Sequence, residues 1–528
     1  MNTKPIYILL YLLIITFVSK GQSFPNDTYY SQQWYLQNIQ VEQAWGITKG
    51  SPSIKVAIID AGINWNHQEL GPVYNNIQKM YLNPGEEAWN PWNNPSSGNG
   101  IDSDQNGFID DRMGWDFYHI TQGDLFVSDN NPTPNYSTWP YYHGTAISGI
   151  IAAKTNNGDF IAGIAGGDAS ANNPGVLVIP IKIMDKKLNT NQSYIDFYQL
   201  GDAIKYAVDL GANVINISFG GDPDPHYNSL IQQGLDYAYS HNVAVVVSSG
   251  NSNSPINSVP ALLQNVIRVG ATDADDMRWE FSSYGASNKP LDLVAPGVLI
   301  PMLTNDDAIF QPAGSNTLCG TSYSAAMVSA TIGLMLSVNQ GLNPDEIRQI
   351  LRESSDKVNP LYYTYTNGYN DYMGYGRLNT YQAVCMAISE MQVNTITSLS
   401  QTWNTPRYSG DIVIEQGKTL TISTTVYMNP GSKIVIEPGG LLILDNAILT
   451  NCPVCGNNNQ MWKGIEVWGD RNSNQLVVNG QCAQGRLIIR NQSLIEHAEI
   501  GVLLAARNSN GTRSEERRVG KECRSRWS

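Results

Sequence analysis

The sequence predicts an α/β protein, with a parallel sheet covered by helices on both faces, that continues into a β-solenoid region. The sheet is predicted because short runs rich in Val and Ile alternate with helix-like segments between residues 53 and 389. The solenoid is predicted because residues 412–422 match residues 434–444 at a spacing of 22. With 528 residues, 42% of them hydrophobic, the chain can form more than one core.

Five apolar runs are predicted to be buried strands of the parallel sheet. They are Ile54–Asp60, Val176–Lys182, Val214–Ser218, Val243–Ser248 and Val266–Gly270. Helices are predicted between them at Tyr194–Leu210 and Tyr227–Ser240. In such sheets the chemistry gathers at the carboxyl ends of the strands, so polar residues that follow these runs are candidates for a site.

Residues 1–20 are predicted to be a signal peptide. Ile6–Ser19 is apolar almost throughout, but it is shorter than the roughly 20 residues that a membrane span needs. Cleavage is expected between Ser19 and Gln22, and a membrane anchor is the alternative. No later segment reaches membrane-spanning length, so no integral membrane segment is expected after cleavage.

Residues 513–528 differ from the rest of the chain. They have no apolar period and a sudden basic bias, and the string resembles the translation of a sequencing-library adapter. We therefore expect an artefactual tail without regular structure, and a natural chain that continues beyond Thr512. A genuine basic tail is the alternative.

The charge balance limits the partners of the protein. The chain has 32 basic and 46 acidic residues, a formal charge of −14. This argues against nucleic acid or an anionic membrane surface as the main partner. An acidic surface fits an exported protein, and clustered carboxylates fit calcium.

The cysteines indicate a disulfide in the C-terminal part. Cys452 and Cys455 form a C-x-x-C pair with Cys482 nearby, and a zinc site would need a fourth ligand that is not evident. A disulfide among these three is expected in an exported chain. Cys319 and Cys385 stand in apolar surroundings and are predicted to be buried thiols.

The sequence pattern changes after about residue 391, where helical periodicity disappears. Further strand-like runs follow the 22-residue repeat at Gly464–Val467, Gln475–Val478, Arg486–Ile489 and Ser493–Glu496. Residues 391–512 resemble right-handed parallel β-helix domains, and the region is expected to be truncated. A small β-sandwich is the alternative. A cell surface or a glycan is the possible binding partner expected for this region.

Three segments carry chemistry. Asp60 ends an apolar strand, His143 begins the small-residue run His-Gly-Thr-Ala, and Ser322 stands in Gly-Thr-Ser-Tyr-Ser-Ala-Ala at the start of a predicted helix. Each alone has an ordinary explanation, since a strand-terminal Asp caps turns and a Ser before a helix is often an N-cap. Their joint occurrence in the order Asp, His, Ser has no such ordinary explanation.

This joint pattern resembles the subtilase family of subtilisin-like serine peptidases over roughly Gln33–Met386. The supporting stretches are Val214–Gly221, Ser248–Asn251, Val294–Gly297 and Gly374–Asn379. The resemblance implies a subtilisin-like peptidase domain at 21–390 and a secreted or cell-surface serine endopeptidase that acts on polypeptides.

The resemblance also implies roles for individual residues. His143 would take the proton of Ser322, and Asp60 would orient His143. Asn251 would donate to the oxyanion, together with the Ser322 backbone N–H. Extended substrate backbone would pair with the segment formed by Ser218, Phe219 and Gly220, which favours broad specificity.

Two features depart from the family pattern. Ala61 follows Asp60 where the family usually has Ser or Thr, so one hydrogen bond near the carboxylate is lost and we expect tuning of activity. Only about 30 residues separate the predicted signal peptide from the first strand, which is too few for the inhibitory prodomain that many subtilases carry.

An insertion at about 98–118 carries a motif of alternating oxygen ligands. It resembles the first ten positions of an EF-hand calcium loop, with a glycine for the sharp turn. The usual bidentate Glu is missing, because Met113 stands there. A structural Ca²⁺ ion is predicted, and an Asx-rich turn without metal is the alternative. The predicted ligands are Asp102, Asp104, Asn106, the Phe108 carbonyl, Asp110 and Asp111.

Two other classes of function compete with a peptidase. One is a catalytically inactive scaffold whose solenoid binds a surface or a glycan, although every catalytic position is occupied. The other is a glycan-active enzyme seated on the solenoid, although no cluster of paired carboxylates is evident there.

Overall fold

A computed structural model describes most of the chain, and the description that follows is limited to those residues. They are 24–71, 77–86, 98–118, 128–186 without 137 and 139, 193–306 without 287, 309–310, 319–389, 394–396, 400–452 without 405, 461–470, 484–507, 513–519 and 524–526. The predicted signal peptide, Cys455, Cys482 and the run at 475–478 lie outside them.

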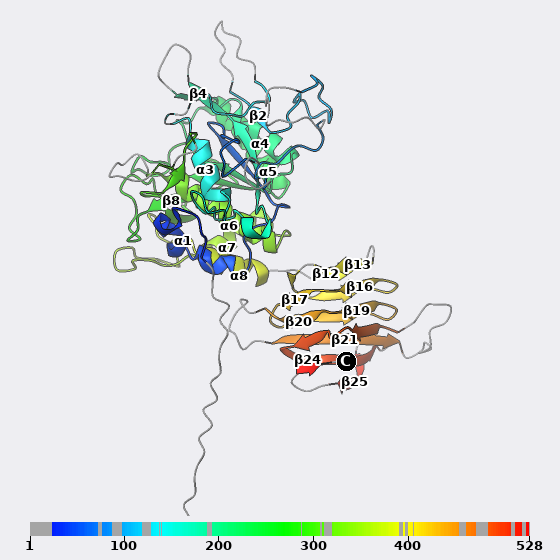
Figure 1. The fold of residues 1–528 in the computed structure, drawn as a ribbon. Coiled ribbons are helices and arrows are strands. Elements are labelled where there is room, and N and C mark those ends of the chain that lie inside the picture. The colour runs from blue at the N-terminus through cyan, green and yellow to red at the C-terminus, as the bar shows by residue number, and fades with distance from the viewer. Residues whose placement is uncertain are drawn as a thin grey trace, which may run out of the picture.

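A seven-stranded parallel sheet forms the centre of the N-terminal part (Figure 1). Its strands in spatial order are β2 (Trp115–Asp116), β3 (Leu177–Lys182), β1 (Lys55–Asp60), β6 (Val214–Ile217), β7 (Ala244–Ser248), β8 (Ile267–Thr272) and β9 (Leu293–Pro296). The strands are buried almost throughout because both faces of the sheet are covered.

Helices and short pairings complete this part. The helices are α1 (Trp34–Asn38), α2 (Val41–Trp45), α3 (His143–Ala152), α4 (Leu200–Asp209), α5 (Pro225–Ser240), α6 (Thr321–Val338), α7 (Pro344–Ser354) and α8 (Thr380–Ser389), with 3-10 turns at Tyr30–Gln32 and Ala169–Ala171. Two hairpins pair β4 (Met184–Lys186) with β5 (Ser193–Ile195) and β10 (Met302–Leu303) with β11 (Ile309–Phe310). One core cluster contains α3, α6 and α8, and another contains α4 and α5.

The five predicted strands of the sheet are confirmed, and so is the helix at Tyr227–Ser240, which begins two residues earlier. The helix predicted at Tyr194–Leu210 is wrong at its start. Tyr194 belongs to β5, and the Asp196 carboxylate accepts the N–H of Tyr198 at 3.1 Å in a turn that precedes α4. A side chain that bonds to the backbone two residues on competes with helix formation, so the helix begins only at Leu200.

Helix α6 runs through the middle of the N-terminal part. Among the described residues it alone has the length and composition of a membrane span, but 89% of its apolar window is buried within the protein. A helix that is apolar on all sides is expected in a core. The catalytic candidate Ser322 therefore stands at the start of a fixed, buried element.

The C-terminal part consists mainly of three sheets of parallel strands (Figure 1). The first contains β12 (Asn394–Ile396), β15 (Ile412–Ile414), β18 (Lys433–Ile436), β21 (Trp462–Asp470) and β24 (Ala498–Arg507). The second contains β13 (Gln401–Trp403), β16 (Thr419–Ile422), β19 (Leu441–Asp445) and β22 (Arg486–Arg490), and the third contains β14 (Arg407–Ser409), β17 (Thr425–Met428), β20 (Ile448–Asn451) and β23 (Leu494–Glu496).

Successive strands pass from one of these sheets to the next in a fixed order. The predicted repeat sets the register, since Ile412 pairs with Ile434 and Leu420 with Leu442. The side chains of these four residues form part of a separate apolar core. The predicted strands at 464–467, 486–489 and 493–496 lie within or overlap β21, β22 and β23.

The C-terminal part packs directly against α8. The buried Asn429 side chain donates to the Ile388 carbonyl at 2.6 Å. The stacked rings of Tyr408 and Tyr427, 5.0 Å apart, contact the same core cluster as α8. Cys452 belongs to that cluster and is disulfide-bonded, as predicted for the C-x-x-C region, although its partner lies outside the described residues. Cys385 is a buried free thiol, whereas Cys319 is free and only half-buried.

The expectation that residues 513–528 lack regular structure is wrong. Strand β25 (Arg513–Val519) pairs antiparallel with β24, and β26 (Arg524–Arg526) pairs antiparallel with β23. The last parallel strands offer unpaired N–H and C=O groups at the sheet edge, and such an edge pairs with any available extended segment. Pairing at an edge depends on the backbone, so an apolar period is not required.

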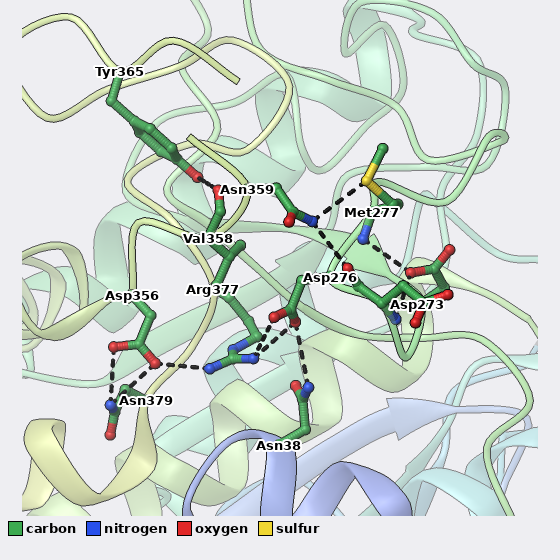
Figure 2. A network of polar contacts seen from close by, with 11 residues as sticks. Asn38, Asp273, Asp276, Met277, Asp356, Val358, Asn359, Tyr365, Arg377 and Asn379 are labelled. Atoms are coloured by element: carbon green, nitrogen blue, oxygen red, sulfur yellow. Dashed lines mark hydrogen bonds and ion pairs between the residues drawn. The ribbon is translucent and has the colours of Figure 1, made fainter. Parts of the chain in front are cut away.

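A network of polar side chains ties the N-terminal helices to the segment that precedes α8 (Figure 2). The Arg377 guanidinium donates to both oxygens of Asp276, at 2.8 and 2.7 Å, and to Asp356 at 2.8 Å. Asn379 donates to Asp356, and Asn38 at the end of α1 donates to Asp276. One guanidinium therefore compensates two carboxylates from separate segments.

We expect Arg377→Met to lower the free energy of unfolding by about 2–3 kcal/mol, because it leaves two facing carboxylates without a cation. Urea unfolding of the purified protein would measure the change. The control is Lys205→Met, which removes a cation from an exposed pair with Asp202 and should cost less than about 1 kcal/mol. Equal effects of the two substitutions would contradict the role of the network.

Candidate active site

Two of the predicted catalytic residues are in direct contact. Asp60 ends β1 and His143 begins α3, and Nδ1 of His143 lies 2.9 Å from each carboxylate oxygen of Asp60. Both side chains are buried. The Ala61 N–H donates to Asp60 Oδ1 at 2.7 Å, so the backbone supplies a hydrogen bond to this carboxylate.

Ser322, the third catalytic candidate, lies in the first turn of α6. The ring of the next residue, Tyr323, has its centroid 6.1 Å from that of His143, which places the start of α6 beside the imidazole. The Ser322 hydroxyl donates to the Ser218 carbonyl at 2.7 Å, and the Ser218 hydroxyl donates to the Ser322 carbonyl at 3.1 Å. The nucleophile candidate is thus held by Ser218, the residue that follows β6. Catalytic hydrogen bonds often tighten only when substrate is bound.

Asn251 and the Ser322 backbone N–H face a common space next to Gly320. A Cβ on Gly320 would lie 3.6 Å from Asn251 Nδ2 and 3.8 Å from the Ser322 nitrogen. The φ of Gly320 is 176°, an extended backbone that any residue adopts, and a Cβ there would fit but would occupy the space that both donors face. A carbonyl oxygen in that space could accept from both donors.

Thr321 orients Asn251, and the motif analysis did not single it out. Its N–H and its hydroxyl both donate to Asn251 Oδ1, at 3.1 and 2.8 Å. Because both donors occupy the oxygen of the amide, the Nδ2 group is turned toward the space at Gly320. The Gly250 N–H donates to the Thr321 hydroxyl, which holds that hydroxyl in turn. The sequence feature that could have indicated this role is the position of Thr321 directly before Ser322.

The segment Ser218, Phe219 and Gly220 continues from β6 and is not assigned to a strand. Its far end is fixed, since Gly221 and Val259 exchange two backbone hydrogen bonds of 3.1 and 3.0 Å. The Phe219 ring contacts the second core cluster. This part of the segment is therefore anchored, while its backbone is free of a neighbouring strand within the described residues.

The predicted calcium loop is folded around its own side chains. Asp102 accepts the N–H groups of Asn106 and Gly107, at 3.1 and 2.8 Å. The Asn106 amide donates to Asp104 and to Asp111, at 3.2 and 3.1 Å. The Phe108 ring packs against Tyr206, 4.6 Å between centroids, which anchors the loop to the core.

Glu86, which the sequence analysis missed, joins this loop. Carboxylate oxygens of Glu86, Asp102 and Asp104 all lie within 4.8 Å of one another. Glu86 is 3% exposed, and its Oε2 is buried without a hydrogen-bond partner. Burial raises the pKa of Glu86. An unpartnered buried oxygen beside two carboxylates fits a hard divalent cation, which would supply the missing charge.

Asp110 and Asp111, the last two residues of the motif, have different surroundings. Asp110 accepts the N–H groups of Asn99 and Gly100, at 3.0 and 2.8 Å, and its φ is +57°. Asp111 is buried and accepts from Asn83 at 2.8 Å in addition to Asn106. Burial raises the pKa of Asp111. The structure thus brings Asp102 and Asp104 together with Glu86, and Asp111 lies beside Asp104 because Asn83 and Asn106 each donate to both.

A second pair of buried carboxylates lies near the N-terminal segment. Oδ1 of Asp27 and Oε2 of Glu69 are buried without hydrogen-bond partners. Burial raises the pKa of Asp27 from 3.8 to about 6, and it raises the pKa of Glu69 well above its usual value. Asn156 and Asn157 donate to the other oxygens of this pair, which only partly compensates the burial.

We expect the free energy of unfolding to fall by about 2 kcal/mol between pH 4 and pH 6 because of Asp27. The folded state keeps this proton up to about pH 6, whereas the unfolded chain releases it near 3.8, so the folded state binds more protons in that window and loses stability as the pH rises. Urea unfolding in chelator should show that Asp27→Asn makes this slope smaller, while the other buried carboxylates with raised pKa, such as Glu69, keep the rest of it. Glu280→Gln, a change to an exposed acid elsewhere, should leave the slope unchanged. A slope that is unchanged in Asp27→Asn would contradict the assignment.

Comparison with known proteins agrees with this geometry. The model of the subtilase family matches residues 51–376, more than half of the chain. The chain is similar to a thermophilic serine proteinase of a Bacillus species, with 31% identity over 68% of this chain and 69% of that protein. It is also similar to thermitase from Thermoactinomyces vulgaris, with 30% identity over 68% of this chain and 99% of thermitase.

A solved structure supports the fold. A protease of Pseudoalteromonas arctica superposes with a TM-score of 0.50 and 22% identity, over 69% of this chain and all of that structure. The residues matched by the family model include all seven strands of the central sheet, and they contain Asp60, His143 and Ser322. The chain therefore belongs to the subtilase family, and it is a subtilisin-like serine endopeptidase.

Proposed function

We propose that the protein is a secreted endopeptidase that hydrolyses peptide bonds through Asp60, His143 and Ser322. The single observation that supports this most is the 2.9 Å contact between His143 and the buried Asp60, next to the start of α6. The carboxylate favours the cationic imidazole that forms when His143 takes the proton of Ser322. That step requires the Ser322 hydroxyl to leave the Ser218 carbonyl and turn to the imidazole.

The reaction then follows from the positions of the donors. The Ser322 oxygen attacks the substrate carbonyl carbon, and the carbonyl oxygen becomes an oxyanion. In this proposal the oxyanion occupies the space at Gly320, where Asn251 Nδ2 and the Ser322 N–H can donate to it. His143 passes its proton to the leaving amine, and water then releases the acyl group by the same steps in reverse order.

Substrate backbone is proposed to pair with Ser218, Phe219 and Gly220 by β-augmentation. The support is an anchored segment whose backbone has no neighbouring strand among the described residues. Recognition through the main chain gives little side-chain selection, so a broad specificity for unfolded polypeptides is expected.

Export and the C-terminal region are part of the same proposal. The apolar run within residues 1–20 supports secretion, with the mature peptidase domain at 21–390. We propose that residues 391–512 form a right-handed β-helix, because parallel strands alternate regularly among three sheets around one core. A cell surface or a glycan remains the proposed partner of this region.

Labelling with a fluorophosphonate tests the proposal. This reagent reacts with a serine only when a base and an oxyanion site activate it. The wild type should be labelled and Ser322→Ala should not. Absence of labelling in a folded wild type would favour the alternative, an inactive scaffold that acts through its C-terminal region.

We also propose that the loop at 98–118 holds one structural Ca²⁺ ion. Glu86, Asp102 and Asp104 would hold the ion with carboxylate oxygens, and the Phe108 carbonyl and Asn106 are further oxygen donors. This set places Glu86 in the role of the glutamate that the motif lacks. The loop contains none of the proposed catalytic residues, so the ion would add stability without taking part in hydrolysis.

Removal of calcium should lower the melting temperature and accelerate self-digestion. Binding to the folded state alone stabilises it by about 2.7 kcal/mol when calcium is at 100 times its Kd. Asp104→Ala and Glu86→Gln should each bind one calcium ion fewer than the wild type, as measured by calorimetric titration. Glu280→Gln, which changes an exposed acid elsewhere, should bind as the wild type does. An unchanged stoichiometry in Glu86→Gln would exclude its role.

A further inference from the structure

The Asp60 segment and the first turn of α3 meet through glycines. A Cβ on Gly144 would lie 2.3 Å from the Gly62 carbonyl oxygen and 3.1 Å from the Asp60 Cβ, so no side chain fits at that contact. Gly62 has a φ of +90°, and a Cβ there would lie 2.6 Å from the Pro132 carbonyl oxygen. Interlocked side chains normally fix the relative orientation of packed elements. Here other groups must fix it.

Asn305 supplies bonds to both sides of His143. It follows β10, which packs against α3, and its Nδ2 group donates to the Tyr136 carbonyl at 2.9 Å and to the Tyr141 carbonyl at 3.4 Å. Its Oδ1 accepts the Thr145 hydroxyl at 2.5 Å. One amide therefore holds the chain before His143 and the first turn of the helix that His143 begins.

The same residue is bonded to the Asp60 segment. The Asn64 side chain donates to the Asn305 carbonyl at 2.7 Å, and the Asn64 N–H donates to the Thr145 hydroxyl at 2.9 Å. Asn64 lies four residues after Asp60. Thr145 is fully buried, so its hydroxyl depends on these partners. Asn305, Asn64 and Thr145 thus form a closed set of bonds across three segments.

We propose that Asn305 is a positioning residue that sets the geometry between Asp60 and His143. The proposal rests on the proposed function of that pair. Asn305 is not in contact with either carboxylate or imidazole in the described hydrogen bonds, and it acts through Asn64 and Thr145. Its loss would let the two glycine-lined segments shift by fractions of an ångström, and such shifts matter because misplacement by about 1 Å can cost 10²-fold in rate.

Asn305→Ala should lower kcat about tenfold and change KM by less than about twofold. The acid limb of the kcat/KM profile should move to lower pH, because a looser carboxylate stabilises the cationic imidazole less. Thr145→Val removes the same network from the α3 side and should behave alike. The double variant should lose little more than Asn305→Ala alone, since both substitutions break one set of bonds.

Asn359→Ala is the matched control. Asn359 is also half-buried, and its amide donates to the Asp275 carbonyl and to Met277 Sδ, far along the chain from the catalytic candidates (Figure 2). It should leave kcat and the acid limb unchanged even if it lowers the melting temperature. An unchanged acid limb in Asn305→Ala, or an equal shift in Asn359→Ala, would overturn the proposal.

A second measurement does not require activity. In a Ser322→Ala background, the proton on His143 Nδ1 can be followed by NMR of histidine-labelled protein, and Asn305→Ala should accelerate its exchange with solvent. Unchanged exchange would overturn the positioning role. Lack of hydrolysis by the wild type would instead count against the proposed function, so the two failures are distinguishable.

Discussion

Ser322→Ala should reduce the hydrolysis of denatured casein by about 10⁶-fold in kcat, the loss expected when a triad that acts as a unit loses its nucleophile. The side chain is buried at the start of a fixed helix, so the substitution removes an oxygen and leaves the packing intact. The melting temperature should therefore change by no more than a few degrees. Steady-state kinetics with purified protein, together with the melting temperature, would check both expectations.

Substitutions at the other proposed catalytic residues and at a neighbouring serine distinguish a catalytic effect from a general disturbance of the site. His143→Ala should lower kcat about as much as Ser322→Ala. Asp60→Ala should lower kcat by a factor roughly 10² smaller, because the imidazole can still act when it is poorly oriented. Ser324→Ala, two residues further along α6, removes a hydroxyl that bonds to the Ala295 carbonyl and should retain most of the activity. Full activity in Ser322→Ala would refute the assignment.

The part of the site that could be predicted from sequence is the part that local patterns determine. A buried parallel strand requires a run of branched apolar residues, so the position of Asp60 at the end of β1 was readable. The 22-residue repeat likewise gave the register between Ile412 and Ile434, because stacked strands place equivalent residues side by side. In both cases the residues that form the sequence pattern are the same residues that form the contacts in the structure.

Contacts between distant segments could not be read in this way. Glu86 approaches Asp102 and Asp104 from a segment that precedes the loop, and the spacing of the motif gives no sign of this contact. Asn305 is bonded to Asn64 across 241 residues, and no spacing rule relates such positions. The turn at Asp196 shows the same limit locally, since one side-chain bond shortened a predicted helix.

Asn251→Ala should lower kcat by about 10²–10³-fold, or about 2.7–4 kcal/mol in the activation barrier, with little change in KM. The amide would bind the oxygen more strongly when it carries negative charge than when it is a neutral carbonyl, so its loss should affect the transition state more than the bound substrate. Asn251 is exposed, and its replacement should not disturb the core. Kinetics with a chromogenic peptide would separate the two constants.

Thr321→Val provides the decisive comparison for this prediction. It keeps the N–H that donates to Asn251 Oδ1 but removes the hydroxyl that donates to the same oxygen, so the amide loses one of the two bonds that orient it. Its effect on kcat should therefore lie between those of the wild type and Asn251→Ala, and the double variant should resemble Asn251→Ala, since an absent amide needs no orientation. If Asn251→Ala raised KM and left kcat unchanged, the amide would serve substrate binding alone. Fully additive losses would instead mean that Thr321 acts independently of Asn251.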